Sequence, residues 1–310
     1  MKKALVFGMD GFVGDHMARE LTANGYEVYA SSSHGNKLNT FDGWYGCDLT
    51  DADQVKNVIA EVSPTHIVNL AGQSNVGISW KIPRRTVESN VCGPLNILEA
   101  IHQCELDCDV MMIGSSEEYG ISDSDLSESD KLDASNPYGI SKEMLEKFCF
   151  LYRERYKMRI HYVRSFNHTG IGQNDNFVIP SWCKQVAAIS LSGRPGELSV
   201  GNLDIIRDFS NVKDIVRAYR LILESDDCSI VYNVGSGKGI PLRKILDYIV
   251  SLCEYPVEVK VDPKLIRPIE NPRICCNSDL LKERLGWKPE YDIFRTVKEI
   301  YDFYYENEKE

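Results

Sequence analysis

The segment Asn136–Lys142, which reads NPYGISK, places Tyr138 and Lys142 four positions apart. In a helix, side chains at this spacing share one face and can meet the same small molecule. A free phenol has a pKa near ~10, and a neighbouring ammonium lowers that pKa toward the range useful for acid–base catalysis. Pro137 suits the first turn of such a helix, and Asn136 or Ser135 is a candidate cap. The alternative is a pair of surface residues on an amphipathic helix, so the rest of the chain must decide.

Strand-like and helical segments alternate through the first half of the chain. Short apolar runs typical of buried strands occur at Lys3–Phe7, Glu27–Ala30, His66–Leu70, Asp109–Ile113 and Arg159–Arg164. Apolar residues at helical spacing predict helices at Phe12–Asn24, Asp51–Val62, Pro83–Cys104 and Pro137–Tyr156. This order predicts an α/β fold with a doubly wound, Rossmann-like parallel sheet and right-handed crossovers.

After Asn167 the pattern becomes less regular. A strand is predicted at Ile230–Val234, and helices are predicted at Phe177–Leu191, Asn211–Glu224, Pro241–Leu252, Asp279–Leu285 and Thr296–Tyr305. We expect residues 1–165 and 208–234 to form a dinucleotide-binding domain, and residues 166–207 and 235–310 a smaller C-terminal substrate-binding domain. The acidic, serine-rich segment Ser122–Asp130 is interpreted as a mobile surface loop.

A glycine-rich turn joins the first predicted strand to the first predicted helix. Gly8, Gly11 and Gly14 form a G-x-x-G-x-x-G arrangement in which Phe12 and Val13 open the helix. Glycines there allow a pyrophosphate to approach the helix N-terminus, where free N–H groups and the helix dipole favour anions. In this strand–turn–helix context, the turn predicts dinucleotide binding.

The end of the second strand bears on the choice of dinucleotide. An acidic residue there would hold the ribose 2′-hydroxyl of NAD, but the chain has Ser31, Ser32 and Ser33. Hydroxyl groups can bond a 2′-phosphate without repelling it. No arginine stands at this strand end, although Lys37 is near. The sequence therefore favours NADP(H) and leaves NAD(H) open.

Two further strand ends offer contacts to the dinucleotide. Asp48 and Leu49 follow a candidate third strand, where the aspartate either caps the next helix or accepts a hydrogen bond from the adenine amine. Leu70, Ala71 and Gly72 end the fourth strand as a loop passing close to a cofactor would, or they form an ordinary strand-to-loop turn. Both interpretations are open.

Composition limits the kinds of partner that the chain can have. The 310 residues are 43% hydrophobic and 26% charged, as in a soluble globular protein, and no run approaches the ~20 apolar residues that span a bilayer. The N-terminus lacks the features of a signal peptide, so a cytoplasmic location is expected. A net charge of −11 argues against nucleic acid and anionic membranes. The 10 cysteines lack the spacing of a zinc site and are expected to be reduced thiols without a metal.

The segment Gly114–Gly120, which reads GSSEEYG, supplies a serine after the fifth strand. Together these segments resemble the extended short-chain dehydrogenase/reductase family over nearly the whole chain. The resemblance implies that Ser115 bonds the reacting oxygen and Tyr138 transfers the proton. It further implies that Lys142 lowers the pKa of Tyr138 and holds the nicotinamide ribose. Asn90 matches a helix asparagine that supports this relay, or it is a polar residue on an exposed helix face.

Three blocks are similar to one branch of this family, the GDP-4-dehydro-6-deoxy-D-mannose reductases, which make GDP-D-rhamnose. They are Gln73–Pro83 (QSNVGISWKIP), Phe166–Gln173 (FNHTGIGQ) and Gly201–Phe209 (GNLDIIRDF). The second block carries Ile171 where the family has proline, and the third is shared with nucleotide-sugar dehydratases. Late R-P, P-R and L-G-W-x-P signals, at Arg267-Pro268, Pro272-Arg273 and Leu285–Pro289, fit the same branch.

The resemblance also implies a substrate site for a GDP-linked 6-deoxyhexulose. Arg207 and Arg267 would bind the diphosphate through charge-assisted bonds, unless they are surface ion-pair partners. The other implied substrate contacts are Gln73, Ser74, Ser115, Ser116, Asn167, Val178, Lys184 and Arg273. Phe166 and His168 would lie near the nicotinamide. The implied reaction is NAD(P)H-dependent reduction of the C4 ketone, giving GDP-D-rhamnose or its 4-epimer GDP-6-deoxy-D-talose.

Other functions remain open at this point. Glu117 stands where GDP-mannose 4,6-dehydratases carry the carboxylate that abstracts a proton, so a dehydratase is the main alternative. A nucleotide-sugar 4-epimerase and a nucleotide sensor without catalysis are more distant. The family leads us to expect a homodimer formed through the helices at Pro83–Cys104 and Pro137–Tyr156, whose apolar residues could equally be core.

Overall fold

Seven parallel strands form the main sheet, in the order β10-β6-β5-β4-β1-β2-β3. The structure is a computed structural model and describes residues 2–33, 41–266 and 271–307. The strands are β1 (Lys2–Phe7), β2 (Tyr26–Ser32), β3 (Gly43–Gly46), β4 (His66–Asn69), β5 (Asp109–Ser115), β6 (Arg159–Ser165) and β10 (Val231–Val234). This order reverses direction between β1 and β4, as in doubly wound folds. The prediction of a parallel α/β sheet is therefore confirmed.

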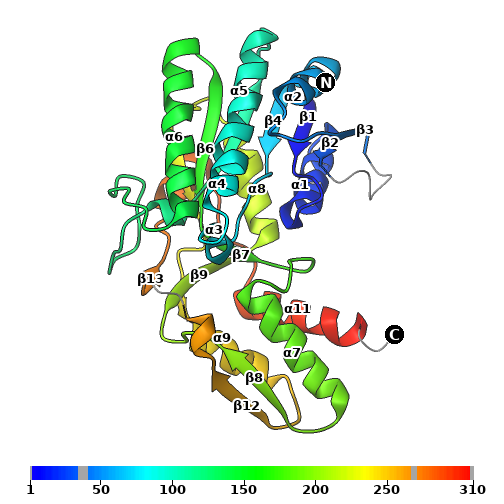
Figure 1. Cartoon of the computed structure of the whole chain (residues 1–310), viewed down its shortest axis with the longest axis vertical. Coiled ribbons are helices and arrows are strands. Elements are labelled where there is room, and N and C mark those ends of the chain that lie inside the picture. Colours follow the sequence, from blue (N-terminus) through cyan, green and yellow to red (C-terminus); the bar gives the residue numbers. More distant parts are fainter. Residues whose placement is uncertain (1, 34–40, 267–270, 308–310) are drawn as a thin grey trace.

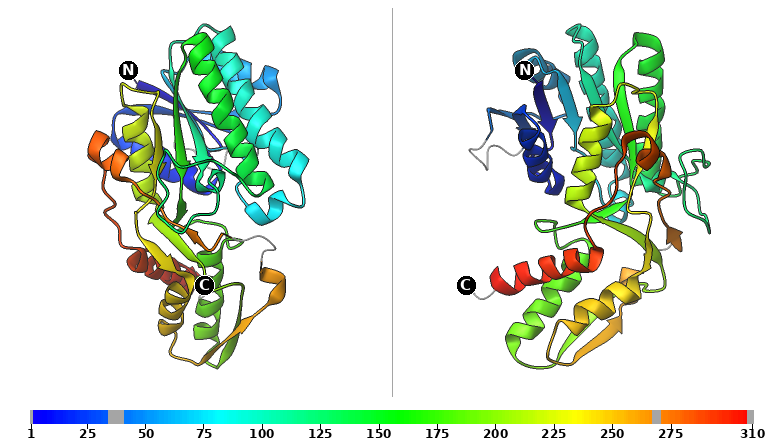
Figure 2. Two further views of the ribbon diagram at one scale, coloured as in Figure 1. Left: turned by 90° about the vertical axis from the view of Figure 1, so that its left-hand side faces the viewer. Right: turned by 180° about the vertical axis from the view of Figure 1, so that it is seen from behind.

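Helices cover both faces of the sheet (Figure 2). Helices α1 (Phe12–Ala23) and α8 (Val212–Leu223) pack on one face, while α2 (Ala52–Val62), α5 (Gly93–Gln103) and α6 (Pro137–Tyr156) pack on the other. Alternate residues of β1 enter the two cores: Ala4 and Val6 face the first group of helices, and Leu5 and Phe7 face the second. This alternation follows from the two-residue period of a strand and explains why the strands are apolar throughout.

The predicted bounds of α6 agree with the structure because its end signals are local. Asn136 caps the helix, since its side chain accepts a hydrogen bond from the amide of Gly139. Pro137 occupies the first position, where its missing N–H costs nothing. The helix ends at Lys157, which adopts the left-handed conformation. None of the described helices is both long enough and apolar enough to span a membrane.

The prediction of one continuous helix over Pro83–Cys104 is wrong in its middle. The chain forms α4 (Pro83–Val87), a π-helical turn at Glu88–Cys92 and then α5. Pro94 lacks the N–H that would bond the carbonyl of Asn90 in an α-helix, so the regular ladder cannot pass through this turn. The widened turn carries Asn90, which is fully buried rather than on an exposed face.

A smaller group of elements packs below the carboxyl edge of the sheet in Figure 1. It contains the helices α7 (Val178–Ser192), α9 (Leu242–Ser251) and α11 (Ile293–Asn307) and the parallel pair β8 (Gly196–Val200) and β12 (Val257–Val261). These elements share a core of their own. A second small sheet joins them to the main sheet through β7 (Asn167–Thr169), β9 (Ile206–Asn211), β11 (Gly239–Pro241) and β13 (Arg273–Ile274). Helix α10 (Asp279–Leu285) has the bounds that the sequence predicts.

The segment Ser122–Asp130, predicted to be a mobile surface loop, is anchored at two points. Leu126 is buried and forms a bridge with Cys276. The Glu128 carboxylate accepts a hydrogen bond of 2.8 Å from the amide of Asn233 in β10. The acidic side chains of this segment therefore include one, Glu128, that contacts the protein and not only solvent.

All ten cysteines are free thiols in the structure. Those buried are Cys47, Cys108, Cys149, Cys183, Cys275 and Cys276. Burial raises the pKa of Cys47 to about 11 and that of Cys108 to about 12, so both remain protonated at neutral pH. Within the described ranges, no group of three histidine, cysteine, aspartate or glutamate side chains is arranged to hold a metal ion.

Candidate active site

The residues predicted to do chemistry gather at the carboxyl edge of the main sheet. Gly8 follows β1, Gly72 follows β4, and Ser115 ends β5. Tyr138 and Lys142 lie in the first turns of α6, which packs beside β5 and β6. This edge faces the smaller group of elements in Figure 1. In doubly wound sheets, ligands bind at this edge, near the point where the strand order reverses.

The glycine turn after β1 has the geometry of an anion cradle. A Cβ on Gly8 would lie 2.5 Å from the backbone nitrogen of Ala71, and Gly8 has a φ of +78° that favours glycine. A Cβ on Gly14 would lie 2.1 Å from the carbonyl oxygen of Met9. No side chain caps the N-terminus of α1, whose preceding residue is Gly11. The amides of Gly11 and Gly14 bond carbonyl groups within the turn, so the part of the turn that fits a pyrophosphate is the uncapped start of α1 at Phe12 and Val13.

Strand β2 contacts the glycine turn through its backbone. The carbonyl oxygen of Ser31 accepts hydrogen bonds from the amides of Gly8 and Met9, at 2.9 and 3.2 Å, and so holds the glycine turn. The side chains of Ser31 and Ser32 are both buried. Lys37, the cation named with them, lies outside the described residues.

Asp48 and Leu49 follow β3, as predicted. The Asp48 carboxylate accepts bonds from the amide and hydroxyl of Thr50, at 2.9 and 2.8 Å, whereas Asp51 caps α2. Asp48 therefore shapes the turn and does not cap the helix. Leu49 packs against Gly93, where an added Cβ would lie 3.0 Å from the Leu49 Cβ.

The loop after β4 is clamped by Asn90. Its Oδ1 accepts a bond of 2.7 Å from the amide of Gln73, and its Nδ2 donates to the Gln73 carbonyl at 2.9 Å and to the Ser141 hydroxyl at 3.0 Å. Gly72 allows this approach, because a Cβ there would lie 2.7 Å from Asn90 Oδ1. The π-helical turn thus ties the loop carrying Leu70, Ala71 and Gly72 to α6, one residue from Lys142.

Ser115, Tyr138 and Lys142 lie together, and all three side chains are buried. The Ser115 hydroxyl lies close enough to the Tyr138 phenol to lower the pKa of that phenol. Lys142 Nζ lies 5.9 Å from the centre of the Tyr138 ring and donates a bond of 2.7 Å to the carbonyl oxygen of Ile113 in β5. The first turns of α6, which carry Tyr138 and Lys142, therefore lie beside the end of β5, which carries Ser115.

The pKa of Tyr138 is raised in the structure, whereas the sequence led us to expect that Lys142 lowers it. Burial raises the pKa of Tyr138, the neighbouring Ser115 hydroxyl lowers it, and the negative charges of Glu117 and Glu118 raise it further. Burial lowers the pKa of Lys142 to about 8. In this state the phenol is a proton donor rather than a phenolate.

Glu117 lies beside the tyrosine at the entrance of the 3-10 turn Ser116–Glu118. Its carboxylate accepts a bond of 2.8 Å from Nδ2 of Asn136, the residue that caps α6. A Cβ on Gly139 would lie 2.1 Å from the Glu117 carbonyl oxygen, so the helix and the turn are in tight backbone contact. The side chain of Ser116, a predicted substrate contact, is buried in this turn.

His168 and Phe166 occupy different environments. The His168 ring stacks on Phe12 of the glycine turn, with centroids 6.1 Å apart, and its Nδ1 bonds the carbonyl oxygen of Phe166 at 3.0 Å. Burial lowers the pKa of His168, which is therefore neutral. The Phe166 side chain is inside a small core with Tyr119, so only its backbone is available to a ligand.

The predicted substrate residues line the small sheet and its surroundings. Arg207 lies on β9 and Arg273 on β13, and Ile206 pairs with Arg273 across these strands. Arg207 is buried and donates to the carbonyl of Ile206 at 2.8 Å, and Arg273 forms an ion pair with Asp125. Lys184 on α7 pairs with Asp175 at 2.6 Å. Of the remaining predicted contacts that are described, Gln73 and Ser74 lie in the loop after β4, Asn167 begins β7 and Val178 begins α7. Ser74 and Asn167 are exposed, and Gln73 bonds Thr86. Arg267 lies outside the described residues.

Several residues of this region were not singled out by sequence patterns. Asn136 is predicted as a cap but not as the partner of Glu117. Asp125 comes from a segment predicted to be mobile, yet it pairs with Arg273. Glu118 is a buried carboxyl directly behind Ser115. Its position three residues after Ser115 matches a capping box, the one local signal that would have found it.

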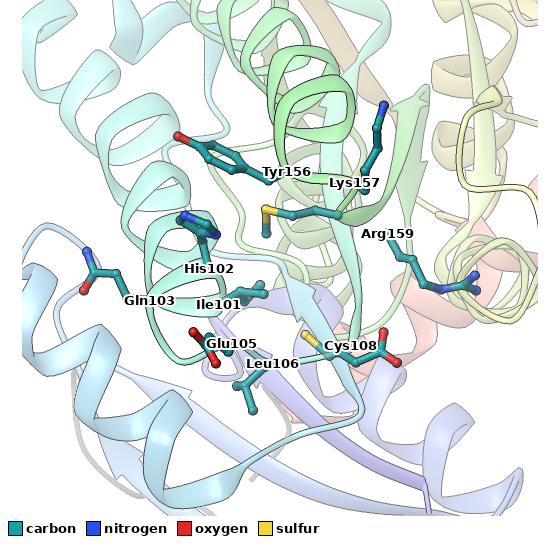
Figure 3. A pocket seen from close by; sticks show the side chains of 11 residues that line it. Ile101, His102, Gln103, Glu105, Leu106, Cys108, Tyr156, Lys157 and Arg159 are labelled. Carbon is teal, nitrogen blue, oxygen red and sulfur yellow. The ribbon is translucent and has the colours of Figure 1, made fainter.

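A surface hollow of about 530 Å³ lies at the opposite edge of the sheet (Figure 3). The ends of α5 and α6 and the starts of β5 and β6 form it, with the rings of His102 and Tyr156 4.1 Å apart. None of the predicted site residues lines this hollow. It carries charged side chains of both signs, among them Glu105 and Lys157, and is not part of the site at the carboxyl edge.

Comparison with known proteins agrees with this geometry. The chain matches the family model described as GDP-mannose 4,6 dehydratase over residues 5–300. A GDP-6-deoxy-D-mannose reductase of Pseudomonas aeruginosa is 30% identical over 302 residues, which cover 96% of each chain. A GDP-mannose 4,6-dehydratase of Vibrio cholerae is 28% identical over 346 residues, covering 96% of this chain and 92% of the relative.

Two solved structures share the architecture. The structure of RMD from Pseudomonas aeruginosa complexed with NADPH matches with a TM-score of 0.87 and 28% identity, covering 99% of this chain and 100% of that one. A UDP-glucose 4-epimerase of Thermus thermophilus complexed with NAD matches with a TM-score of 0.85 and 26% identity, covering 97% and 98%. These matches confirm the predicted fold and enzyme class. The chain belongs to the GDP-mannose 4,6-dehydratase family, within the extended short-chain dehydrogenase/reductases.

Proposed function

We propose that this protein reduces the C4 ketone of GDP-4-dehydro-6-deoxy-D-mannose, using a nicotinamide dinucleotide as the hydride donor. The product is GDP-D-rhamnose or its 4-epimer GDP-6-deoxy-D-talose, according to the face of the ketone that receives hydride. The similarity to a GDP-6-deoxy-D-mannose reductase over 96% of both chains supports this choice of substrate. The three sequence blocks at Gln73–Pro83, Phe166–Gln173 and Gly201–Phe209 support the same branch of the family.

The dinucleotide would bind across the carboxyl edge of the sheet. Gly8, Gly11 and Gly14 with the first turn of α1 would hold its pyrophosphate, because the turn has no side chain that fills the space. The ribose and nicotinamide would lie toward Lys142 and the loop after β4. When bound, the reduced nicotinamide supplies a hydride to the carbonyl carbon of the sugar.

This chain's own residues would polarise the ketone and supply the proton. Ser115 would donate a hydrogen bond to the ketone oxygen, and Tyr138 would transfer its phenolic proton to that oxygen as it gains charge. The Lys142 ammonium would stabilise the resulting phenolate and bond the ribose. The burial of all three side chains excludes water and strengthens these electrostatic effects.

The single observation that carries the assignment as a reductase is the 30% identity to a GDP-6-deoxy-D-mannose reductase over 96% of both chains, and the state of Tyr138 is consistent with it. A reduction needs a protonated phenol at the start of the reaction, and burial together with nearby carboxylates keeps Tyr138 in that form. An enzyme that first oxidises its sugar needs the phenolate instead.

The sugar nucleotide would extend from Tyr138 toward the small sheet. Arg207, Arg273 and Lys184 are the described cations near that path, and Arg267 is a further candidate by sequence. Arg273 and Lys184 each face a carboxylate in the structure, Asp125 and Asp175, which a substrate diphosphate would replace as the partner. Gln73, Ser74, Ser116, Asn167 and Val178 would contribute further contacts.

We also propose that residues 1–165 and 208–234 hold the dinucleotide and that residues 166–207 and 235–310 hold the sugar nucleotide. NADP(H) is favoured over NAD(H), because no carboxylate ends β2 to repel a 2′-phosphate. The NADPH complex of the similar Pseudomonas protein supports this preference. Titration of the protein with each cofactor measures it directly.

We expect the protein to act in the cytoplasm as a homodimer. Helix α6 exposes a row of apolar side chains that a second copy would cover: Ile140, Met144, Phe150, Leu151 and Tyr156. Light scattering should give the mass of a dimer for the native chain and of a monomer for Leu151→Glu. A monomeric native chain would overturn the assembly but not the reaction.

A GDP-mannose 4,6-dehydratase is the second candidate, because Glu117 lies close enough to raise the pKa of Tyr138 and is held by Asn136. One assay separates the two functions. The protein is mixed with NADPH and GDP-4-dehydro-6-deoxy-D-mannose, and cofactor absorbance is followed. Stoichiometric loss of NADPH supports the reductase; no loss, with conversion of GDP-mannose to the keto sugar, supports the dehydratase.

A further inference from the structure

Glu118 is a fully buried carboxyl group that contacts the backbone of Ser115. Its Oε1 accepts a hydrogen bond of 2.5 Å from the Ser115 amide. The Ser115 hydroxyl in turn accepts a bond of 3.1 Å from the Glu117 amide, which completes a capping box around the 3-10 turn. The position of the Ser115 side chain therefore depends on Glu118.

Tyr162 connects the same carboxyl group to α6. Its hydroxyl lies 3.1 Å from Glu118 Oε1 and 2.8 Å from the carbonyl oxygen of Lys142. Tyr162 is on β6 and is fully buried. One short path of hydrogen bonds thus runs from the backbone of Ser115 through Glu118 and Tyr162 to the turn of α6 that carries Lys142.

Gly114 makes room for this arrangement. A Cβ at this residue would lie 2.4 Å from Glu118 Oε1 and 2.5 Å from the Tyr162 hydroxyl. No rotation of a single side chain would relieve both contacts. The backbone of β5 is therefore shaped to accept the Glu118 carboxyl beside Ser115.

The charges around Glu118 favour its neutral form. Two nearby cations could balance it, but the Arg164 guanidinium is bound to both oxygens of Glu146, at 2.6 and 2.8 Å, and the Lys142 ammonium donates to the Ile113 carbonyl. Burial raises the pKa of Glu118, the neighbouring Glu146 carboxylate raises it further, and the Ser115 amide and Arg164 only partly oppose the shift. Its Oε2 is buried without any hydrogen-bond partner, which disfavours a negative charge on the carboxyl group.

We propose that Glu118 is a positioning residue of the active site, a buried neutral carboxylic acid that sets Ser115 against Tyr138 and ties both to the Lys142 turn. The kinetic part of this inference rests on the proposed function, since it assigns catalytic roles to Ser115, Tyr138 and Lys142. The structural part does not. Glu118 itself reaches neither substrate nor cofactor, because it lies behind β5 with no exposed surface.

Two variants at this residue test the proposal. Glu118→Gln keeps the Oε1 acceptor and replaces the carboxyl group by an uncharged amide, so it should retain kcat. Glu118→Leu fills a similar volume but removes the acceptor. Displacing Ser115 by about 1 Å should lower kcat about 100-fold. The KM for NADPH should not change, because neither variant removes a residue that would hold the cofactor.

Tyr162→Phe and Tyr26→Phe provide a matched comparison. Both remove one buried hydroxyl that bonds a carboxyl group, Glu118 in the first case and Glu224 in the second. Tyr26 lies at the amino end of β2, away from the site. Tyr162→Phe should lower kcat, whereas Tyr26→Phe should reduce only stability.

Crystal structures of the Gln and Leu variants give a readout that does not depend on activity. The position of the Ser115 hydroxyl beside the Tyr138 phenol should persist in Glu118→Gln and be lost in Glu118→Leu. Its persistence in Glu118→Leu, or full kcat in that variant, would overturn the inference. Absence of turnover by the native protein with either sugar nucleotide would instead overturn the proposed function, while the crystal structures still decide this one.

Discussion

The ammonium of Lys142 donates a hydrogen bond of 2.7 Å to the backbone carbonyl oxygen of Ile113, two residues before Ser115 in β5. This bond holds the lysine against the strand that carries the serine. The buried ammonium thereby gains one carbonyl partner in place of water.

The first prediction concerns the pH dependence of turnover. Burial lowers the pKa of Lys142 to about 8, so the ammonium loses its proton as pH rises through that value. The rate of reduction should therefore fall above pH 8 in a profile of kcat/KM. Lys142→Arg, whose guanidinium does not titrate in this range, should show a lower rate without this descending limb.

The same shift predicts a change of stability with pH. The folded-state pKa of Lys142, about 8, lies below its ordinary value of 10.5, so the folded protein binds fewer protons between these values. The contribution of Lys142 to the unfolding free energy should rise as pH increases from about 8 to 10.5. Denaturant titrations of the native chain and of Lys142→Met measure it as a difference. A constant difference across this range would contradict the assignment.

Replacing Tyr138 by Phe tests its role as the proton donor. Only the hydroxyl is lost, so kcat should fall by about 10²- to 10⁴-fold. Cofactor affinity, measured by fluorescence titration with NADPH, should be nearly unchanged. Tyr156→Phe, at the exposed far end of the same helix, should keep full activity. Survival of activity in Tyr138→Phe would mean that another group supplies the proton.

Gly14→Ala tests the cofactor turn. Alanine is the better helix former, but its Cβ would lie 2.1 Å from the carbonyl oxygen of Met9. The clash should outweigh the propensity, lower the unfolding free energy by about 1–3 kcal/mol and weaken NADPH binding at least tenfold. Gly46→Ala is the control, because nothing lies within 4 Å of a Cβ there. Equal affinities of the two variants would argue against the turn as the pyrophosphate site.

Arg273→Met tests the diphosphate site. Loss of a charge-assisted bond should raise the KM for the sugar nucleotide about 10- to 100-fold while kcat changes little. Arg243 is the control, since it forms a long ion pair of 3.4 Å with Asp204 and is largely exposed. Steady-state kinetics of Arg273→Met and Arg243→Met give the comparison. A fall in kcat alone would place Arg273 outside substrate binding.

Arg164→Met tests the buried ion pair behind the site. The guanidinium binds Glu146 at 2.6 Å and the hydroxyl of Tyr119 at 2.8 Å. Removing it leaves a buried carboxylate without a partner, so the unfolding free energy should fall by about 3–5 kcal/mol. Arg19→Met breaks an exposed pair with Asp15 and should cost less than about 1 kcal/mol in the same denaturant titration.

Features that depend on neighbouring residues could be predicted from the sequence. The bounds of α6 followed from the Asn136 cap and Pro137, and six of the seven strands of the main sheet followed from short apolar runs, β3 being the exception. The meeting of Tyr138 with Lys142 on one helix face followed from their spacing. The alternation of strands and helices was sufficient for the doubly wound sheet because crossovers between parallel strands have one favoured hand.

Features that depend on distant segments were decided only by the tertiary structure. The strands β7, β8, β9, β11, β12 and β13 are short and gain their stability from partners far along the chain, so no local pattern predicted them. The same holds for the Asn90 clamp on Gln73 and for the pairing of Arg273 with Asp125. The sequence by itself singled out Ser115, Tyr138 and Lys142 as the candidates for the chemistry, and the folded chain brings them together. Burial in the folded protein decided their protonation states, because desolvation depends on every segment that packs around a charge.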